Sequence, residues 1–195
     1  MPLVRDGAGQ VMDFDPDLAL AWAALAVLLF WSVGAYNRLV RLRAQAIASF
    51  QLVDSRLCQH LKLVESELQD GLATEQAACA SEWAGLRDAA SVFEAALRAV
   101  RRQVLHAPAM AVLQDAHDKL QSSWESLMDA RSRLAPPSPL SQTSPCVAAW
   151  RDATQLVAHA ASEFRLAVQA HNQAIDQFPA LLLAMLFGFR PAGYL

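Results

Sequence analysis

The hydrophobic pattern opens with a stretch of eighteen residues, 18–35, that carries no charged side chain. As an α-helix this stretch would rise about 27 Å at ~1.5 Å per residue, close to the ~30 Å hydrocarbon thickness of a bilayer. Trp22 lies near one end, and Trp31 and Tyr36 lie at the other, as is typical of aromatic residues at a membrane interface. The pattern therefore predicts a transmembrane helix over residues 18–35.

Two other interpretations of this stretch agree less well with its flanks. A cleaved signal peptide carries positive charge before its apolar run, whereas residues 13–17 read Asp-Phe-Asp-Pro-Asp, although Val33-Gly-Ala35 would suit a cleavage site. A buried core helix would need a much larger domain around it. We therefore prefer the membrane anchor.

Charge on the two sides of the apolar stretch predicts its direction across the membrane. Arg38, Arg41 and Arg43 follow it closely, and the residues before it are acidic. Short segments rich in arginine and lysine stay in the cytoplasm. We therefore expect residues 1–17 to form a short extracytoplasmic segment and residues 36–195 to form a cytoplasmic domain.

The cytoplasmic part begins with a long apolar stripe. From Leu39 to Leu72 the hydrophobic positions advance in steps of three, four and four residues. This eleven-residue period, ~3.67 residues per turn, stays nearly in line with a straight α-helix. Between Asp17 and Asp70 only Gly34 could weaken the helix. The membrane helix is therefore predicted to continue into the cytoplasm as one rod.

Three breaks divide the rest of the chain. The first is at Gly71–Thr74, where a glycine can end one helix and a threonine can cap the next. The second is at His106–Pro108, because a proline suits the first turn of a helix. The third is a proline-rich connector at residues 136–145. Apolar stripes at helical spacing fill residues 83–104, 110–134 and 147–178.

Together these features predict an all-α protein, with one N-terminal transmembrane helix continuous with an up-down-up-down four-helix bundle of long antiparallel helices. In this topology the His106–Pro108 turn and the C-terminus return to the membrane. Arginines there would form a basic collar that can meet anionic lipid, and solvated arginines at helix ends are the alternative interpretation. The predicted membrane-interface residues are Trp31, Tyr36, Arg38, Arg41, Arg43, Arg101, Arg102 and Arg190.

The last segment, residues 178–195, begins with an apolar run that is too short to span a bilayer as a helix. It either packs against the base of the bundle or lies in the lipid interface. Asn37 and Asn172 are both expected near this end. We hypothesise that their side chains satisfy polar groups where the tail folds back, while His171, on the apolar stripe, is expected to be a core residue.

Charge and residue inventory give little sign of chemistry. The net charge is −3, and because residues 1–35 hold one basic and four acidic groups, the remainder holds 15 of each and is neutral. A neutral domain does not favour nucleic-acid binding. Cys58, Cys79 and Cys146 form no C-x-x-C, and the five histidines form no H-E-x-x-H. We therefore predict a non-enzymatic protein without cofactor or metal.

Two motifs near the ends of the domain resemble the LemA family. One is Tyr36-Asn-Arg-Leu-Val-Arg-Leu-Arg43 directly after a membrane helix, with an aspartate eleven residues on. The other is His171-Asn-Gln-Ala-Ile-Asp-Gln-Phe-Pro179, followed by a Gly-Phe pair near the terminus. The matching positions, which look structural or interfacial, are Tyr36, Asn37, Asp54, Asn172, Phe178, Pro179, Gly188 and Phe189.

The chain departs from the family pattern between these motifs. No proline follows Asp54 in residues 55–64, and Phe164-Arg165 and His171 stand where the family has Tyr-Asn and Tyr. The resemblance, as to a divergent member, implies a membrane-anchored helical bundle of the bacterial inner membrane. The biochemical role of that family is not established, and it offers no catalytic residues to carry over.

These observations predict an interaction or scaffold protein tethered to the bacterial inner membrane, whose partner is another envelope protein. The alternative is a sensor or carrier of a small molecule or lipid, with a pocket between the helices near the bilayer. A filled core with an exposed apolar patch would favour the scaffold, and a sizeable apolar cavity would favour the carrier.

Overall fold

The computed structural model describes residues 16–74, 79–134 and 145–177, and residues 181, 185, 188 and 191–194 of the tail. The side chains of residues 70–74 are not among those described. Within the described part the chain is all-α, and no strand occurs in it. Residues 1–15, most of the connector, and the predicted site residues Phe178, Pro179, Phe189 and Arg190 lie outside it. The helices are α1 (Pro16–Thr74), α2 (Ala80–Arg102), α3 (Ala107–Leu134) and α4 (Pro145–Asp176).

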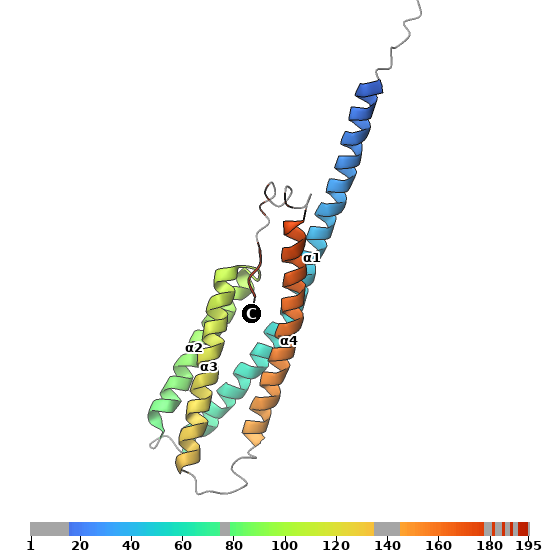
Figure 1. Ribbon diagram of the computed structural model, residues 1–195. Coiled ribbons are helices and arrows are strands. Elements are labelled where there is room, and N and C mark those ends of the chain that lie inside the picture. Colours follow the sequence, from blue (N-terminus) through green and yellow to red (C-terminus); the bar gives the residue numbers. More distant parts are fainter. Residues whose placement is uncertain are drawn as a thin grey trace, which may run out of the picture.

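The predicted rod is confirmed. Helix α1 runs without a break for 59 residues, through Gly34, and ends at Thr74, within the break predicted at Gly71–Thr74. Its first half projects alone from the rest of the molecule (Figure 1). That half contains an apolar window of which none is buried, so this helix is long and apolar enough to cross a membrane. From Leu39 onward the same helix buries one face against the other helices.

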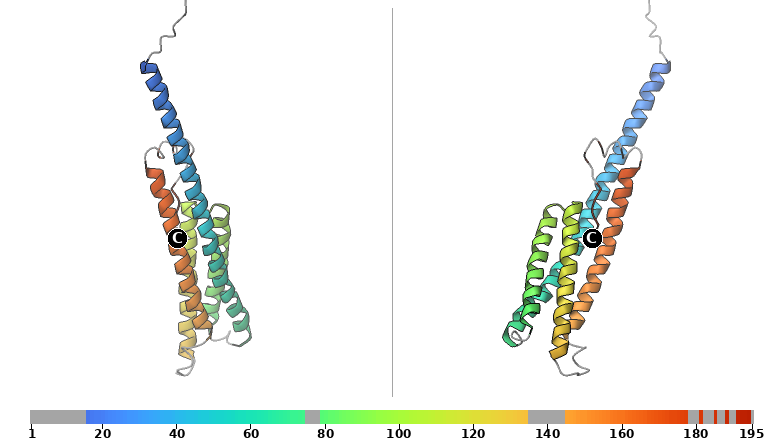
Figure 2. Two further views of the ribbon diagram at one scale, coloured as in Figure 1. Left: turned by 90° about the vertical axis from the view of Figure 1, so that its right-hand side faces the viewer. Right: turned by 60° about the vertical axis from the view of Figure 1, so that its left-hand side comes forward.

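Consecutive helices run in opposite directions along the rod's lower half (Figures 1 and 2). Helix α1 packs mainly on α4, and α2 packs mainly on α3, while a smaller contact joins α1 to α2. The arrangement is therefore two antiparallel pairs laid against each other. Connectivity explains the α2–α3 pair, because helices joined by a short turn lie side by side.

One hydrophobic core joins the two pairs. Side chains from all four helices contribute to it, and the large ones are almost fully buried. Phe50 of α1 meets Phe164 of α4 edge to face, with 5.6 Å between the ring centroids. Trp124 of α3 stacks on Trp150 of α4 at 4.2 Å and 10°. Burial of each such side chain contributes about 1.5–3 kcal/mol. The Phe50–Phe164 contact lies within the α1–α4 pair, whereas the Trp124–Trp150 stack joins the two pairs.

The turn between α2 and α3 lies where the sequence predicts it. Helix α2 ends at Arg102, and α3 begins at Ala107 with Pro108 in its first turn, where the missing N–H costs nothing. This turn lines one cavity with Arg43 of α1. By contrast, α1 meets the end of α4 five residues earlier, where Arg38 contacts Gln177. Five residues of helix correspond to about 7.5 Å at ~1.5 Å per residue. The α2–α3 turn therefore lies about that much farther from the exposed half of α1 than the end of α4 does, whereas we expected both to lie at the membrane.

Candidate functional site

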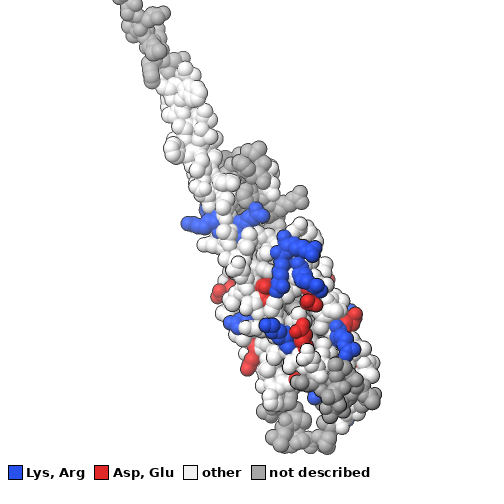
Figure 3. All heavy atoms as spheres, turned by 180° about the vertical axis from the view of Figure 1, so that it is seen from behind, with Lys and Arg blue, Asp and Glu red and all other residues white. Residues whose placement is uncertain are grey.

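The end of the bundle nearest the exposed rod holds most of the predicted site residues. Figure 3 shows a band of basic side chains where the uncharged rod meets the bundle. The Nη1 of Arg38 donates a hydrogen bond to Oε1 of Gln177 at 3.2 Å, while Arg41 and Arg43 are exposed. Trp31 is 49% exposed and Tyr36 is 38% exposed on the rod itself. This part of the predicted interface is thus contiguous on α1.

A cavity of about 440 Å³ lies between α1, α4 and the α2–α3 turn. Arg43 and Ile47 of α1 line one wall, and Arg102 and His106 line another. The described lining residues include no carboxylate. The structure therefore brings together two of the arginines that the sequence placed in a collar.

His171 of α4 forms part of the wall of this cavity. Its side chain is 1% exposed, as expected of a core residue, but Nδ1 has no hydrogen-bond partner. Burial lowers the pKa of His171 below its usual value, and the positive charge of Arg43 lowers it further. The ring is therefore a neutral imidazole with an unsatisfied nitrogen.

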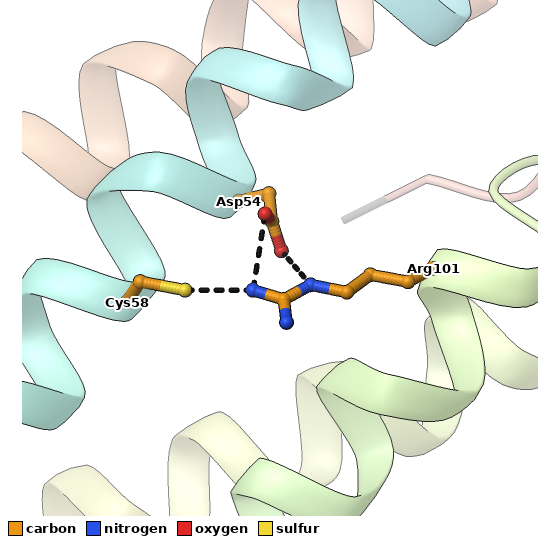
Figure 4. A network of polar contacts seen from close by, with 3 residues as sticks. All are labelled: Asp54, Cys58 and Arg101. Atoms are coloured by element: carbon orange, nitrogen blue, oxygen red, sulfur yellow. Dashed lines mark hydrogen bonds and ion pairs between the residues drawn. The ribbon is translucent and has the colours of Figure 1, made fainter.

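Arg101 is not part of that cavity. Its Nε and Nη2 donate hydrogen bonds to the two carboxylate oxygens of Asp54 at 2.7 and 3.1 Å, and Nη2 also lies 2.8 Å from Sγ of Cys58 (Figure 4). The hydrogen bond with Asp54 raises the pKa of Arg101. The guanidinium of Arg101 is thus turned toward a carboxylate on α1, and its predicted place at the membrane interface stays a prediction. Asp54 thus ties α1 to α2.

Asn172 holds the end of the tail on the bundle. Its Nδ2 donates to the carbonyl oxygen of Ala192 at 3.0 Å and to the hydroxyl of Tyr194 at 3.2 Å, and its Oδ1 accepts from the Ala192 amide at 2.8 Å. A Cβ on Gly193 would come 2.5 Å from Cα of Ala107, so the close approach requires glycine. The hypothesis is confirmed for Asn172. It is wrong for Asn37, which is exposed and makes no hydrogen bond to a described residue.

Asn172→Ala should lower the melting temperature of the full-length protein in mild detergent by about 3–6 °C. The change removes paired hydrogen bonds to the Ala192 backbone, worth about 1–2 kcal/mol together. Asn37→Ala is the matched control and should melt like the wild type. Circular dichroism at 222 nm measures both. Equal melting of all three proteins would contradict the assignment of Asn172.

A second group of unsatisfied polar atoms lies in the core. His60 of α1 is fully buried with neither ring nitrogen hydrogen-bonded, and His117 of α3 leaves Nε2 unpaired. The His60 ring lies 3.9 Å from Trp150 and 5.7 Å from His117 between centroids. Burial, helped by the charge that His117 can carry, lowers the pKa of His60 to about 4. Sequence reasoning missed this pair, although His60 falls between Leu57 and Val64 of the apolar stripe.

The described residues include few side chains suited to bind a metal ion or to act as a nucleophile. They include no group of three or more His, Cys, Asp or Glu side chains that could hold a metal ion. Cys79 is buried. Burial and a hydrogen bond with Glu67 raise the pKa of the Cys146 thiol to about 12, which makes a thiolate at neutral pH rare.

Comparisons with known proteins identified no similar protein. A scan against protein-family models and searches of curated proteins and of solved structures found no match to this chain. The resemblance to LemA proteins therefore rests on the two end motifs alone.

Proposed function

We propose that this protein is a membrane-tethered, non-enzymatic scaffold of the bacterial inner membrane, a divergent relative of LemA proteins, with its helical bundle in the cytoplasm. The observation that carries the proposal is the continuity of α1, which passes from a fully exposed apolar segment into the core of the bundle without a break. A rigid helix holds the bundle at a fixed height and angle beside the membrane. Such positioning matters for a protein that must meet a neighbour in the same membrane.

The orientation follows from charge. Arg38, Arg41 and Arg43 come directly after the apolar segment, and the positive-inside rule favours a cytoplasmic position for them.

The packing of the core supports a scaffold over a carrier. Phe93 and Phe164 are fully buried, and Trp124 is 2% exposed, so large side chains fill the space between the helices. The proposed partner is another envelope protein.

Inserting Gly-Gly-Ser after Tyr36 should keep the protein in the membrane but abolish its specific crosslinks to a partner. The insertion makes the joint between anchor and bundle flexible, so the bundle loses its fixed pose. Affinity purification from crosslinked membranes compares the variant with the wild type. Ser162→Cys, on an exposed face of α4, is added to both proteins.

A membrane-impermeant maleimide should label that cysteine in inverted vesicles and not in intact spheroplasts, which confirms the orientation in both backgrounds. Labelling in spheroplasts would contradict the orientation. A wild type without any reproducible partner, or a variant with unchanged crosslinks, would contradict the scaffold.

A second candidate function is recognition of a lipid or small molecule near the bilayer. The cavity between Arg43, Arg102 and His171 favours it, because it opens at the membrane end of the bundle and carries unpaired polar groups.

A further inference from the structure

The cavity at the membrane end is lined by two arginines that have no carboxylate partner among the described residues. Some other basic side chains on the bundle do pair with carboxylates, as Arg101 does with Asp54, Lys119 with Asp88 and Arg131 with Glu67. Arg43 and Arg102 have no ion pair or hydrogen bond to a described residue. Two positive charges from different helices therefore face one cavity whose described lining has no negative charge to balance them.

The two arginines reach the cavity from elements that are far apart in sequence. Arg43 stands on α1, and Arg102 is the last residue of α2, so the α1–α2 packing and the Asp54–Arg101 ion pair fix their relative positions. Like charges brought together repel each other unless an anion lies between them. The bundle thus fixes the backbone positions from which the two arginines reach the cavity.

His171 supplies an independent observation. Its side chain is 1% exposed, it lines the same cavity, and its Nδ1 has no partner. The imidazole in the cavity wall can offer an N–H to an oxygen-rich ligand. His106, on the turn, adds a second imidazole to the same wall.

We propose that this cavity binds a phosphate group through Arg43, Arg102 and His171. A phosphate monoester carries about −1.5 to −2 charges at neutral pH and three acceptor oxygens, which matches two guanidinium forks and one imidazole donor. A cavity of about 440 Å³ also leaves room for the group to which the phosphate is attached. The proposal rests on the second candidate function and gives its ligand chemistry.

The phosphate can belong to a lipid headgroup or to a soluble molecule. Arg43 lies five residues, about 7.5 Å along α1, beyond Arg38 at the point where the rod leaves the bundle. That distance puts the cavity within reach of a headgroup and equally open to the cytoplasm. The experiment therefore uses both sources.

The test is a binding titration on the full-length protein in nanodiscs of neutral phosphatidylcholine at 150 mM salt, a concentration that screens unspecific attraction. Inorganic phosphate is the soluble probe, and isothermal calorimetry is the readout. The wild type should bind with saturation, and Arg43→Gln and Arg102→Gln should each weaken binding at least tenfold. Arg41→Gln, a neighbouring exposed arginine outside the lining, is the matched control and should stay within twofold of the wild type.

Repeating the titration in nanodiscs that contain phosphatidic acid identifies the source. Loss of phosphate binding by the wild type assigns the site to the lipid headgroup, and unchanged binding assigns it to a soluble phosphate. Binding to the protein in its ¹⁵N-histidine form should also shift the His171 ring signals. Absence of saturable binding in the neutral nanodiscs, or equal affinity of Arg43→Gln, Arg102→Gln and Arg41→Gln, overturns the proposal. That failure leaves the crosslinking test of the scaffold unaffected.

Discussion

Lowering the pH from 7 to 4 should destabilise the wild-type bundle by about 3 kcal/mol more than a His60→Leu variant. The pKa of His60 in the folded protein is about 4, against a usual value of 6.5. Between pH 6.5 and pH 4 the His60 imidazole is therefore mainly protonated in the unfolded chain and mainly neutral in the folded chain. The stability contributed by the neutral ring is fully present above pH 6.5 and is lost as the pH falls toward 4.

The leucine variant should also be more stable at pH 7, by about 1–2 kcal/mol, because both ring nitrogens of His60 are buried without a partner. The measurement is denaturant unfolding of the full-length protein in mild detergent at several pH values, followed by circular dichroism. Burial also lowers the pKa of His117 and of His171. Those two histidines are present in both proteins, so the difference between the curves reports on His60 together with its interaction with His117. Parallel curves would contradict the assigned pKa.

Trp124→Ala should destabilise the protein by about 3–5 kcal/mol, the usual cost of truncating a buried aromatic residue. Trp124 is 2% exposed, and it stacks on Trp150 of α4. The matched control is Trp22→Ala, which removes the same side chain from the rod, where it is 65% exposed. The same unfolding measurement applies. A loss no larger for Trp124→Ala than for Trp22→Ala would contradict the described core.

Much of the helix pattern could be predicted because it depends on local chemistry. The stop before Pro108 follows from the proline ring, and the long α1 follows from an unbroken apolar period. The break predicted at Gly71–Thr74 is confirmed; the helix continues through Gly71 to Thr74 because one glycine costs a helix only about 1 kcal/mol, which the neighbouring turns offset. Local signals of this kind set the order of helices but not their relative heights.

The candidate site depends on those heights and on the angle of each side chain around its helix. Periodicity places Arg101 and Arg102 together at the end of α2, yet adjacent residues point about 100° apart on a helix. As a result Arg101 meets Asp54, while Arg102 lines the cavity with Arg43. Asn172 was predictable as a tail contact from its place near the end of α4. The same reasoning failed for Asn37, which is exposed on α1. The His60–His117 pair required the register of α1 against α3.

The unbroken α1 also makes the molecule a lever. From Tyr36 to Thr74 the helix continues for 38 residues, about 57 Å at ~1.5 Å per residue. A change of 10° in the tilt of the apolar segment would therefore move the far end of α1 sideways by about 10 Å. Membrane thickness alters the tilt of such segments at small energetic cost. In the membrane-tethered protein that we propose, a change in the lipid around the apolar segment would thus swing the far end of α1 through a distance comparable to the width of a helix.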